Sequence, residues 1–94
     1  MTNKQTGTFK LKGLNRKAKT GIYATVDLPK EDWFHSDFDE SVISIDRQYA
    51  LFDMFKNSEE NLWKLNHTVE VEYDKMSSGG VPVNPIIKKI NLDL

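Results

Sequence analysis

The side chains best suited to binding a ligand in this 94-residue chain are cations near its start. Residues 1–26 carry six basic side chains and no acidic one. Lysine and arginine attract phosphate groups, because binding releases the counterions of a polyanion. Tyr23 lies in the same stretch, and an exposed ring can stack a nucleobase. The pattern predicts a nucleic-acid-binding surface made of Lys10, Lys12, Arg16, Lys17, Lys19 and Tyr23, joined by Lys89 from the C-terminal part. The alternative is a solvated basic hairpin that protects a strand edge from aggregation.

The following stretch has the opposite charge. Residues 27–46 hold seven acidic side chains against one lysine. Because carboxylates repel phosphate, we expect this stretch to lie off any nucleic-acid face. Aromatic rings alternate with carboxylates in EDWFHSDFDE (31–40), which would suit docking on a basic protein. The alternative function is therefore a protein-interaction module or inhibitor that uses Trp33, Phe34, Asp37, Phe38, Asp39 and Glu40. In a plainer interpretation, the aromatic rings fold back onto the core while the acids stay in water.

Catalytic patterns are poor in this sequence. The chain has no cysteine, and its two histidines lie in no context typical of a catalytic triad. No glycine-rich phosphate-binding motif is present; Gly79-Gly80 is typical of a turn. We therefore expect a binding protein without enzymatic activity, cofactor or metal ion.

The N-terminal residues are polar, and no apolar run approaches the ~18 residues of a membrane-spanning helix. We expect a cytoplasmic protein without membrane contact. The length predicts one domain over 1–94 with a flexible segment at 1–5. A monomer and a dimer formed through a sheet edge both remain open.

Two stretches near the start alternate apolar and polar residues with the period of a strand. They cover 6–14 and 22–28, and the polar segment 15–21 predicts the hairpin turn between them. Gly13 would mark a β-bulge near the end of the first strand.

The middle of the chain is predicted to hold one short strand among helices. Pro29 favours a helical turn over 30–38, where Phe34 and Phe38 share a face. A third strand is expected over 41–46. A helix over 47–56 would follow, with Asp46 as its N-cap and a core stripe of Tyr49, Phe52 and Phe55, and a second helix would start at Ser58.

Strand periodicity returns over 68–74 and 81–94, with a turn at Ser77–Gly80. The order β-β-β-α-β-β predicts a mainly β protein with a helical insertion. Five strands in so short a chain leave exposed edges unless the sheet closes. We expect a five-stranded OB-type barrel, with another small barrel or an α+β sheet as the alternative. In the barrel, the lysine-rich turn and the glycine-rich turn would gather at one rim.

The stretch VEVEYDKMSSGGVPVNPIIKKI (69–90) resembles the closing hairpin of the OB domain in ATP-dependent DNA ligases. The matching residues are Val69, Val71, Tyr73, Gly80, Pro82, Pro85, Lys88 and Lys89. The resemblance covers about a quarter of the chain, and the K-x-D-G motif of the ligase nucleotidyltransferase domain is absent. What it implies is the OB fold, without ligase activity. Together with the basic hairpin, it predicts a small protein that binds single-stranded DNA or RNA, of the kind that phages and mobile elements use as accessory proteins.

Overall fold

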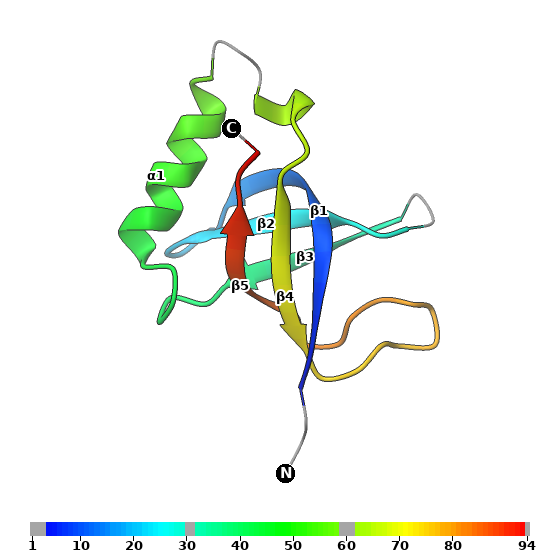
Figure 1. Ribbon diagram of the computed structural model, residues 1–94. Helices are drawn as coiled ribbons and strands as arrows, with labels where there is room; N and C mark the ends of the chain where they lie inside the picture. Colours follow the sequence, from blue (N-terminus) through cyan, green and yellow to red (C-terminus); the bar gives the residue numbers. More distant parts are fainter. Residues whose placement is uncertain (1–3, 30–31, 59–61, 94) are drawn as a thin grey trace.

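The computed structural model describes residues 4–29, 32–58 and 62–93. Its described elements are five strands, one α-helix and one 3₁₀ turn (Figure 1). In chain order they are β1 (Gln5–Arg16), β2 (Ile22–Asp27), β3 (Trp33–Phe38), α1 (Ile45–Lys56), η1 (Leu62–Lys64), β4 (Thr68–Tyr73) and β5 (Ile86–Asn91).

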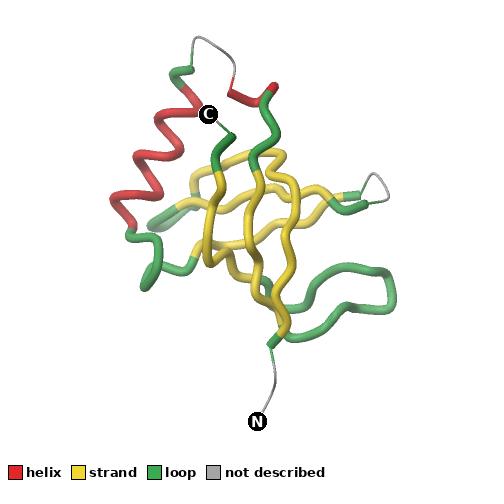
Figure 2. Tube along the Cα trace, in the orientation of Figure 1, coloured by secondary structure: helices red, strands yellow, loops and turns green. Residues whose placement is uncertain are grey.

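The five strands close into a ring in the order β1-β2-β3-β5-β4 (Figure 2). All neighbours are antiparallel except β3 and β5, which run parallel. β1 takes part in two pairings, with β4 through its first half and with β2 through its second half. The register shifts between Leu11 and Gly13, where β1 passes from one partner to the other. The predicted bulge near Gly13 is thus confirmed, as is the mainly β architecture with one helical insertion.

Alternation along the strands fills the inside of the ring. Ile22, Ala24 and Val26 of β2 are fully buried, and Val69 and Val71 of β4 belong to the same core. Burial of each valine or isoleucine side chain stabilises the fold by about 1.5–3 kcal/mol. The period-two pattern in the sequence therefore identified both strands correctly.

The third strand is not where the sequence analysis expects it. β3 covers Trp33–Phe38, within the segment predicted as a helical turn, and 41–46 forms no strand. Phe34, Ser36 and Phe38 are buried at every second position, which only a strand can achieve. Two phenylalanines four residues apart fit either structure, and the buried serine between them decides for the strand. Residues 30 and 31 of the predicted turn lie outside the described part.

Helix α1 begins two residues earlier than predicted. Its N-cap is Ser44, whose hydroxyl accepts a hydrogen bond from the backbone N–H of Arg47, and Asp46 lies in the first turn. The buried stripe consists of Gln48, Leu51 and Phe55, while Tyr49 and Phe52 are only half-buried. The prediction is confirmed for Phe55, whereas Tyr49 and Phe52 pack against the edge of the core and Gln48 and Leu51 take the buried positions.

The predicted second helix is represented by a single 3₁₀ turn. The hydroxyl of Ser58 accepts a hydrogen bond from the N–H of Leu62, at the start of η1. Residues 59–61, which would have formed the start of that helix, lie outside the described residues.

The last two strands are found, but β5 is shorter than its prediction of 81–94. Residues 74–85 form a long loop between β4 and β5, in which Met76 and Pro82 make one isolated bridge. Only residues 4 and 5 of the predicted flexible N-terminus are described, and Gln5 already pairs with Tyr73. No helix in the described ranges is long and apolar enough to cross a membrane.

Candidate binding surface on β2 and β3

Three aromatic side chains lie in contact on the outer face of β2 and β3. The rings of Tyr23 and His35 have centroids 4.9 Å apart, and so do those of His35 and Trp33. We call these three residues the aromatic ladder. Trp33 at its end is 49% exposed. The ladder exists because β2 and β3 pair antiparallel, which sets Thr25 opposite His35 and brings the outward rings within reach of each other.

Each end of the ladder carries an ion pair. Asp37 lies opposite Tyr23, and its carboxylate is 3.1 Å from the Nζ atom of Lys17. At the other end, Asp27 lies opposite Trp33 and is 3.8 Å from the Nζ atom of Lys12. All four charged side chains are at least one third exposed. The surface therefore combines stacked rings with lysines that are accessible to solvent.

The positions of Asp27 and Asp37 contradict an expectation from the sequence. The acidic stretch was predicted to lie off the face that carries Tyr23, yet Asp27 and Asp37 share this face. The reason is the strand β3, which the sequence analysis took for a helical turn. Once 33–38 is a strand beside β2, its outward residues must lie next to Tyr23 and Thr25. Lys12 and Lys17 neutralise the two carboxylates there.

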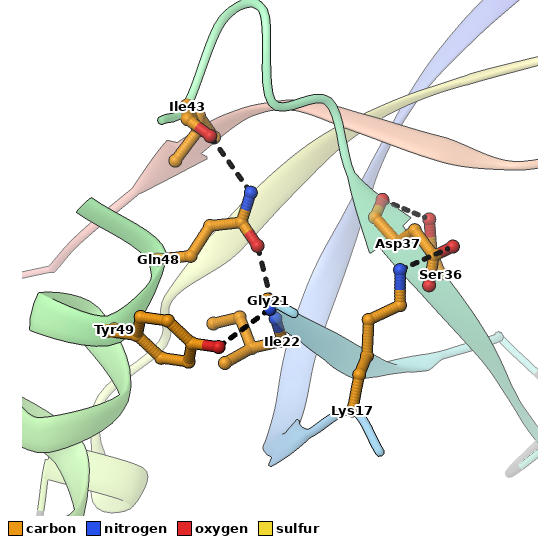
Figure 3. Close-up of polar contacts among 8 residues, drawn as sticks. All are labelled: Lys17, Gly21, Ile22, Ser36, Asp37, Ile43, Gln48 and Tyr49. Carbon is orange, nitrogen blue, oxygen red and sulfur yellow. Dashed lines mark hydrogen bonds and ion pairs between the residues drawn. The ribbon is translucent and has the colours of Figure 1, made fainter. Parts of the chain in front are cut away.

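Helix α1 holds the turn that carries Lys17 (Figure 3). The side chain of Gln48, which is 2% exposed, accepts a hydrogen bond from the N–H of Ile22 and donates one to the carbonyl of Ile43. The hydroxyl of Tyr49 accepts a bond from the N–H of Gly21. These bonds fix the start of β2 and thereby the basic turn, which we define as residues 17–21.

Gly21 is required where the basic turn meets the helix. Its φ angle is +96°, a region that other residues rarely adopt. A Cβ atom at this position would lie 2.9 Å from Oε1 of Gln48, the atom that receives the Ile22 hydrogen bond. Any side chain here would therefore disturb the contact between the turn and the helix.

The lysine-rich and glycine-rich turns do not gather at one rim, contrary to expectation. The basic turn precedes β2, whereas the tip of the long loop, with Gly79 and Gly80, lines a groove together with Leu28 and Pro29, which follow β2. The two turns lie at opposite ends of β2 (Figure 1). Only the base of the long loop reaches the ladder: Asn84 and Pro85 line a groove of about 440 Å³ with Tyr23, His35, Ser36 and Asp37.

The structure places the predicted nucleic-acid-binding residues at four different sites. Lys17 and Lys19 line a hollow with Tyr23 at one end of β2, and Lys10 and Lys12 line another with Asp27 at the other end. Arg16 is directed to α1, where its guanidinium lies 5.0 Å from the ring centre of Tyr49. Lys89 lies on β5 and is 3.9 Å from Glu70 of β4, on another side of the ring.

The residues of the alternative protein-docking surface are divided as well. Phe34 and Phe38 are 5% and 4% exposed and belong to the core, so the plainer interpretation holds for both of them. Asp39 is bound by Lys88 and by the backbone and hydroxyl of Ser41. Hydrogen bonds from Lys88 and Ser41 lower the pKa of Asp39 from 3.8 to about 2. Trp33, Asp37 and Glu40 are the exposed members of that set.

The sequence analysis missed the role of His35, and it assigned Trp33 to a different surface. The signal that could have found both is the alternation in WFHSDF (33–38), where Phe34 and Phe38 flank a serine. With Pro29 placed in a turn, that alternation would have put Trp33, His35 and Asp37 beside Tyr23. Sequence reasoning saw one outward aromatic residue on the strands, and the structure brings three together.

Among the described residues, no group of three or more histidine, aspartate or glutamate side chains could hold a metal ion. The surface on β2 and β3 carries aromatic rings, two aspartates and two lysines. No protein-family model matches this chain, and no curated protein is significantly similar to it in sequence.

Proposed function

We propose that this protein is an OB-type barrel that binds single-stranded nucleic acid on the outer face of β2 and β3. The strand order β1-β2-β3-β5-β4 and the helix between β3 and β4 support the fold assignment. In OB barrels the face of strands two and three is the usual site for oligonucleotides. The aromatic ladder lies on that face.

The observation that carries this proposal is the contact among Tyr23, His35 and Trp33 on an exposed sheet. Stacking of a base on an exposed ring contributes about 1–3 kcal/mol and tolerates any base sequence. Duplex DNA hides the faces of its bases, so this surface favours single strands. Lys12 and Lys17 at the two ends of the ladder supply contacts for phosphate groups.

The test is a fluorescence-anisotropy titration of single-stranded DNA and RNA at two salt concentrations. We expect binding at low salt, a loss of affinity at higher salt, and weaker binding of the matching duplex. Trp33→Ala should reduce the affinity for single strands roughly 5- to 150-fold, as the loss of one stacking contact predicts.

The matched control is Val42→Ala, because Val42 is 51% exposed and lies in the loop before α1. This variant should bind like the wild type. Absence of binding at low salt, or equal affinity of Trp33→Ala and the wild type, would rule out the ladder as a base-stacking surface.

A second candidate function is docking on a basic protein segment. It is favoured by the exposed carboxylate of Asp37 at the Tyr23 end of the ladder and the exposed Trp33 at the other end, since aromatic rings also bind lysine and arginine. The variant Asp37→Lys separates the two functions. It should strengthen binding of a single strand if the ligand is nucleic acid, and abolish binding of a labelled lysine-rich peptide if the ligand is a basic segment.

A further inference from the structure

The two ends of the aromatic ladder repeat one arrangement. At each end an outward ring lies opposite an aspartate, and that aspartate pairs with a lysine from β1 or from the turn after it. The two aspartates are four residues apart along the paired strands, which corresponds to roughly 13 Å. The ladder is therefore bounded by one ion pair on each side.

A second lysine accompanies each ion pair. At the Tyr23 end of the ladder, Lys19 lines a hollow together with Lys17. At the Trp33 end, Lys10 lines a groove together with Lys12 and Asp27. Within the described ranges, neither Lys10 nor Lys19 makes an ion pair. Counting only the part of the chain that the structure describes, each end thus holds one lysine paired with a carboxylate and one lysine without such a partner.

The two aspartates reduce the attraction that the lysines exert on a polyanion. An exposed ion pair is worth about 0.2–1 kcal/mol, so a phosphate group can displace the aspartate from its lysine. The lysine then exchanges a carboxylate for a phosphate group, so this contact adds little to the free energy of binding. The displaced carboxylate stays close to the phosphate and repels it.

We propose that Asp27 and Asp37 are internal counterions of the binding surface, which the phosphate groups of a bound strand replace. This inference rests on the function proposed above and adds a source of selectivity to it. A ligand that offers only phosphate gains little at either end. A single strand gains the stacking of its bases as well, and it is selected over simple polyphosphates and over duplex DNA.

The experiment compares Asp27→Asn and Asp37→Asn with Asp53→Asn. Asparagine keeps the shape of aspartate and removes its charge, and Asp53 is an exposed residue of α1, so all three variants change the net charge equally. The probes are a labelled oligo(dT) strand and inorganic tripolyphosphate, the latter followed by chemical-shift changes. Thermal unfolding of each variant verifies that it is folded.

We expect each ladder variant to bind oligo(dT) roughly two- to five-fold more tightly than Asp53→Asn at low salt. The slope of log affinity against log salt should steepen by about 0.7 for each charge removed. The gain for tripolyphosphate should be larger than the gain for oligo(dT), because selection against bare phosphate is relaxed. Equal or weaker binding by the ladder variants, relative to Asp53→Asn, overturns the inference.

The two proposals can fail separately. If Trp33→Ala weakens oligo(dT) binding while the aspartate variants behave like Asp53→Asn, base stacking stands and the counterion role falls. If the aspartate variants gain tripolyphosphate affinity while oligo(dT) binds regardless of Trp33, the counterion role stands and the proposed function falls.

Discussion

Two outer faces of the same ring carry different side chains. The face of β2 and β3 presents Tyr23 and Trp33, each in contact with His35 between them. The outward positions of β4 are Thr68, Glu70 and Glu72, without an aromatic ring, and Lys89 of β5 pairs with Glu70 there. Both faces cover the same apolar core. The difference teaches that the core constrains only the inward residues of each strand, so the outward residues of the two faces can differ in chemistry without changing the fold.

The largest expected effect comes from removing the ladder at both ends. The double variant Tyr23→Ala/Trp33→Ala should lose at least about thirty-fold in affinity for single strands, because two stacking contacts of about 1–3 kcal/mol are lost. The paired variant Thr68→Ala/Lys89→Ala on the other face should bind like the wild type in the same anisotropy titration. Similar losses from both double variants would erase the distinction between the faces.

Removing the amide that holds the basic turn should weaken the fold itself. Gln48→Leu leaves the buried N–H of Ile22 and the carbonyl of Ile43 without their partner. We expect a loss of about 2–4 kcal/mol in the free energy of unfolding, measured by urea denaturation. Asp53→Ala on the exposed side of α1 should change it by less than about 0.5 kcal/mol. A small effect of Gln48→Leu would show that the turn is held in another way.

Single cations on the two faces should differ in their effect on salt dependence. Lys19→Ala should lower the slope of log affinity against log salt by about 0.7, since a phosphate contact of a lysine without an ion pair in the described ranges is lost. Lys89→Ala removes the same charge from the other face and should leave the slope unchanged. A reduced slope for Lys89→Ala would mean that the bound strand extends onto β5, as the sequence analysis first expected.

The smallest effect concerns pH and the contact between β3 and β5. The pKa of Asp39 is about 2 in the folded protein, against an ordinary value of 3.8. Its ionised form is therefore favoured by folding, and the resulting stability is present above pH 4 and lost as the pH falls towards 2. Asp39→Asn should be less stable than the wild type at pH 7. Thermal unfolding at a series of pH values should show this difference shrinking between pH 4 and pH 2 and constant between pH 5 and pH 7.

The sequence predicted β2 and β4 better than the segment between them. β2 and β4 alternate buried side chains with half-buried, mostly polar ones, and a strand is the element with that period. In β3 the buried positions are Phe34, Ser36 and Phe38, and a buried serine weakens the pattern. Ile43 and Ile45 resemble a short strand, but Ser44 between them caps the helix.

Part of the candidate surface could not be predicted for the same reason. Lys12, Lys17 and Tyr23 were identified because they lie in a basic hairpin that is local in sequence. The contact of Tyr23 with His35 depends on which segment pairs with β2, a choice that the core makes through Phe34 and Phe38. Because the sequence analysis took 33–38 for part of a helical turn, it assigned Trp33 and Asp37 to a separate surface.

The ring is least firmly closed where its parallel strands meet. β3 and β5 share two residue pairs, whereas β1 and β4 share six, and the bonds of Asp39 to Ile87 and Lys88 reinforce the short contact. Local opening requires the least free energy where the fewest contacts are lost. We therefore expect the ring to open locally between β3 and β5, while Gln48 and the pairing of β1 with β2 hold the start of β2 in place. Such opening would change the curvature of the sheet beneath His35, and with it the spacing of the three rings that depend on the pairing of β2 with β3.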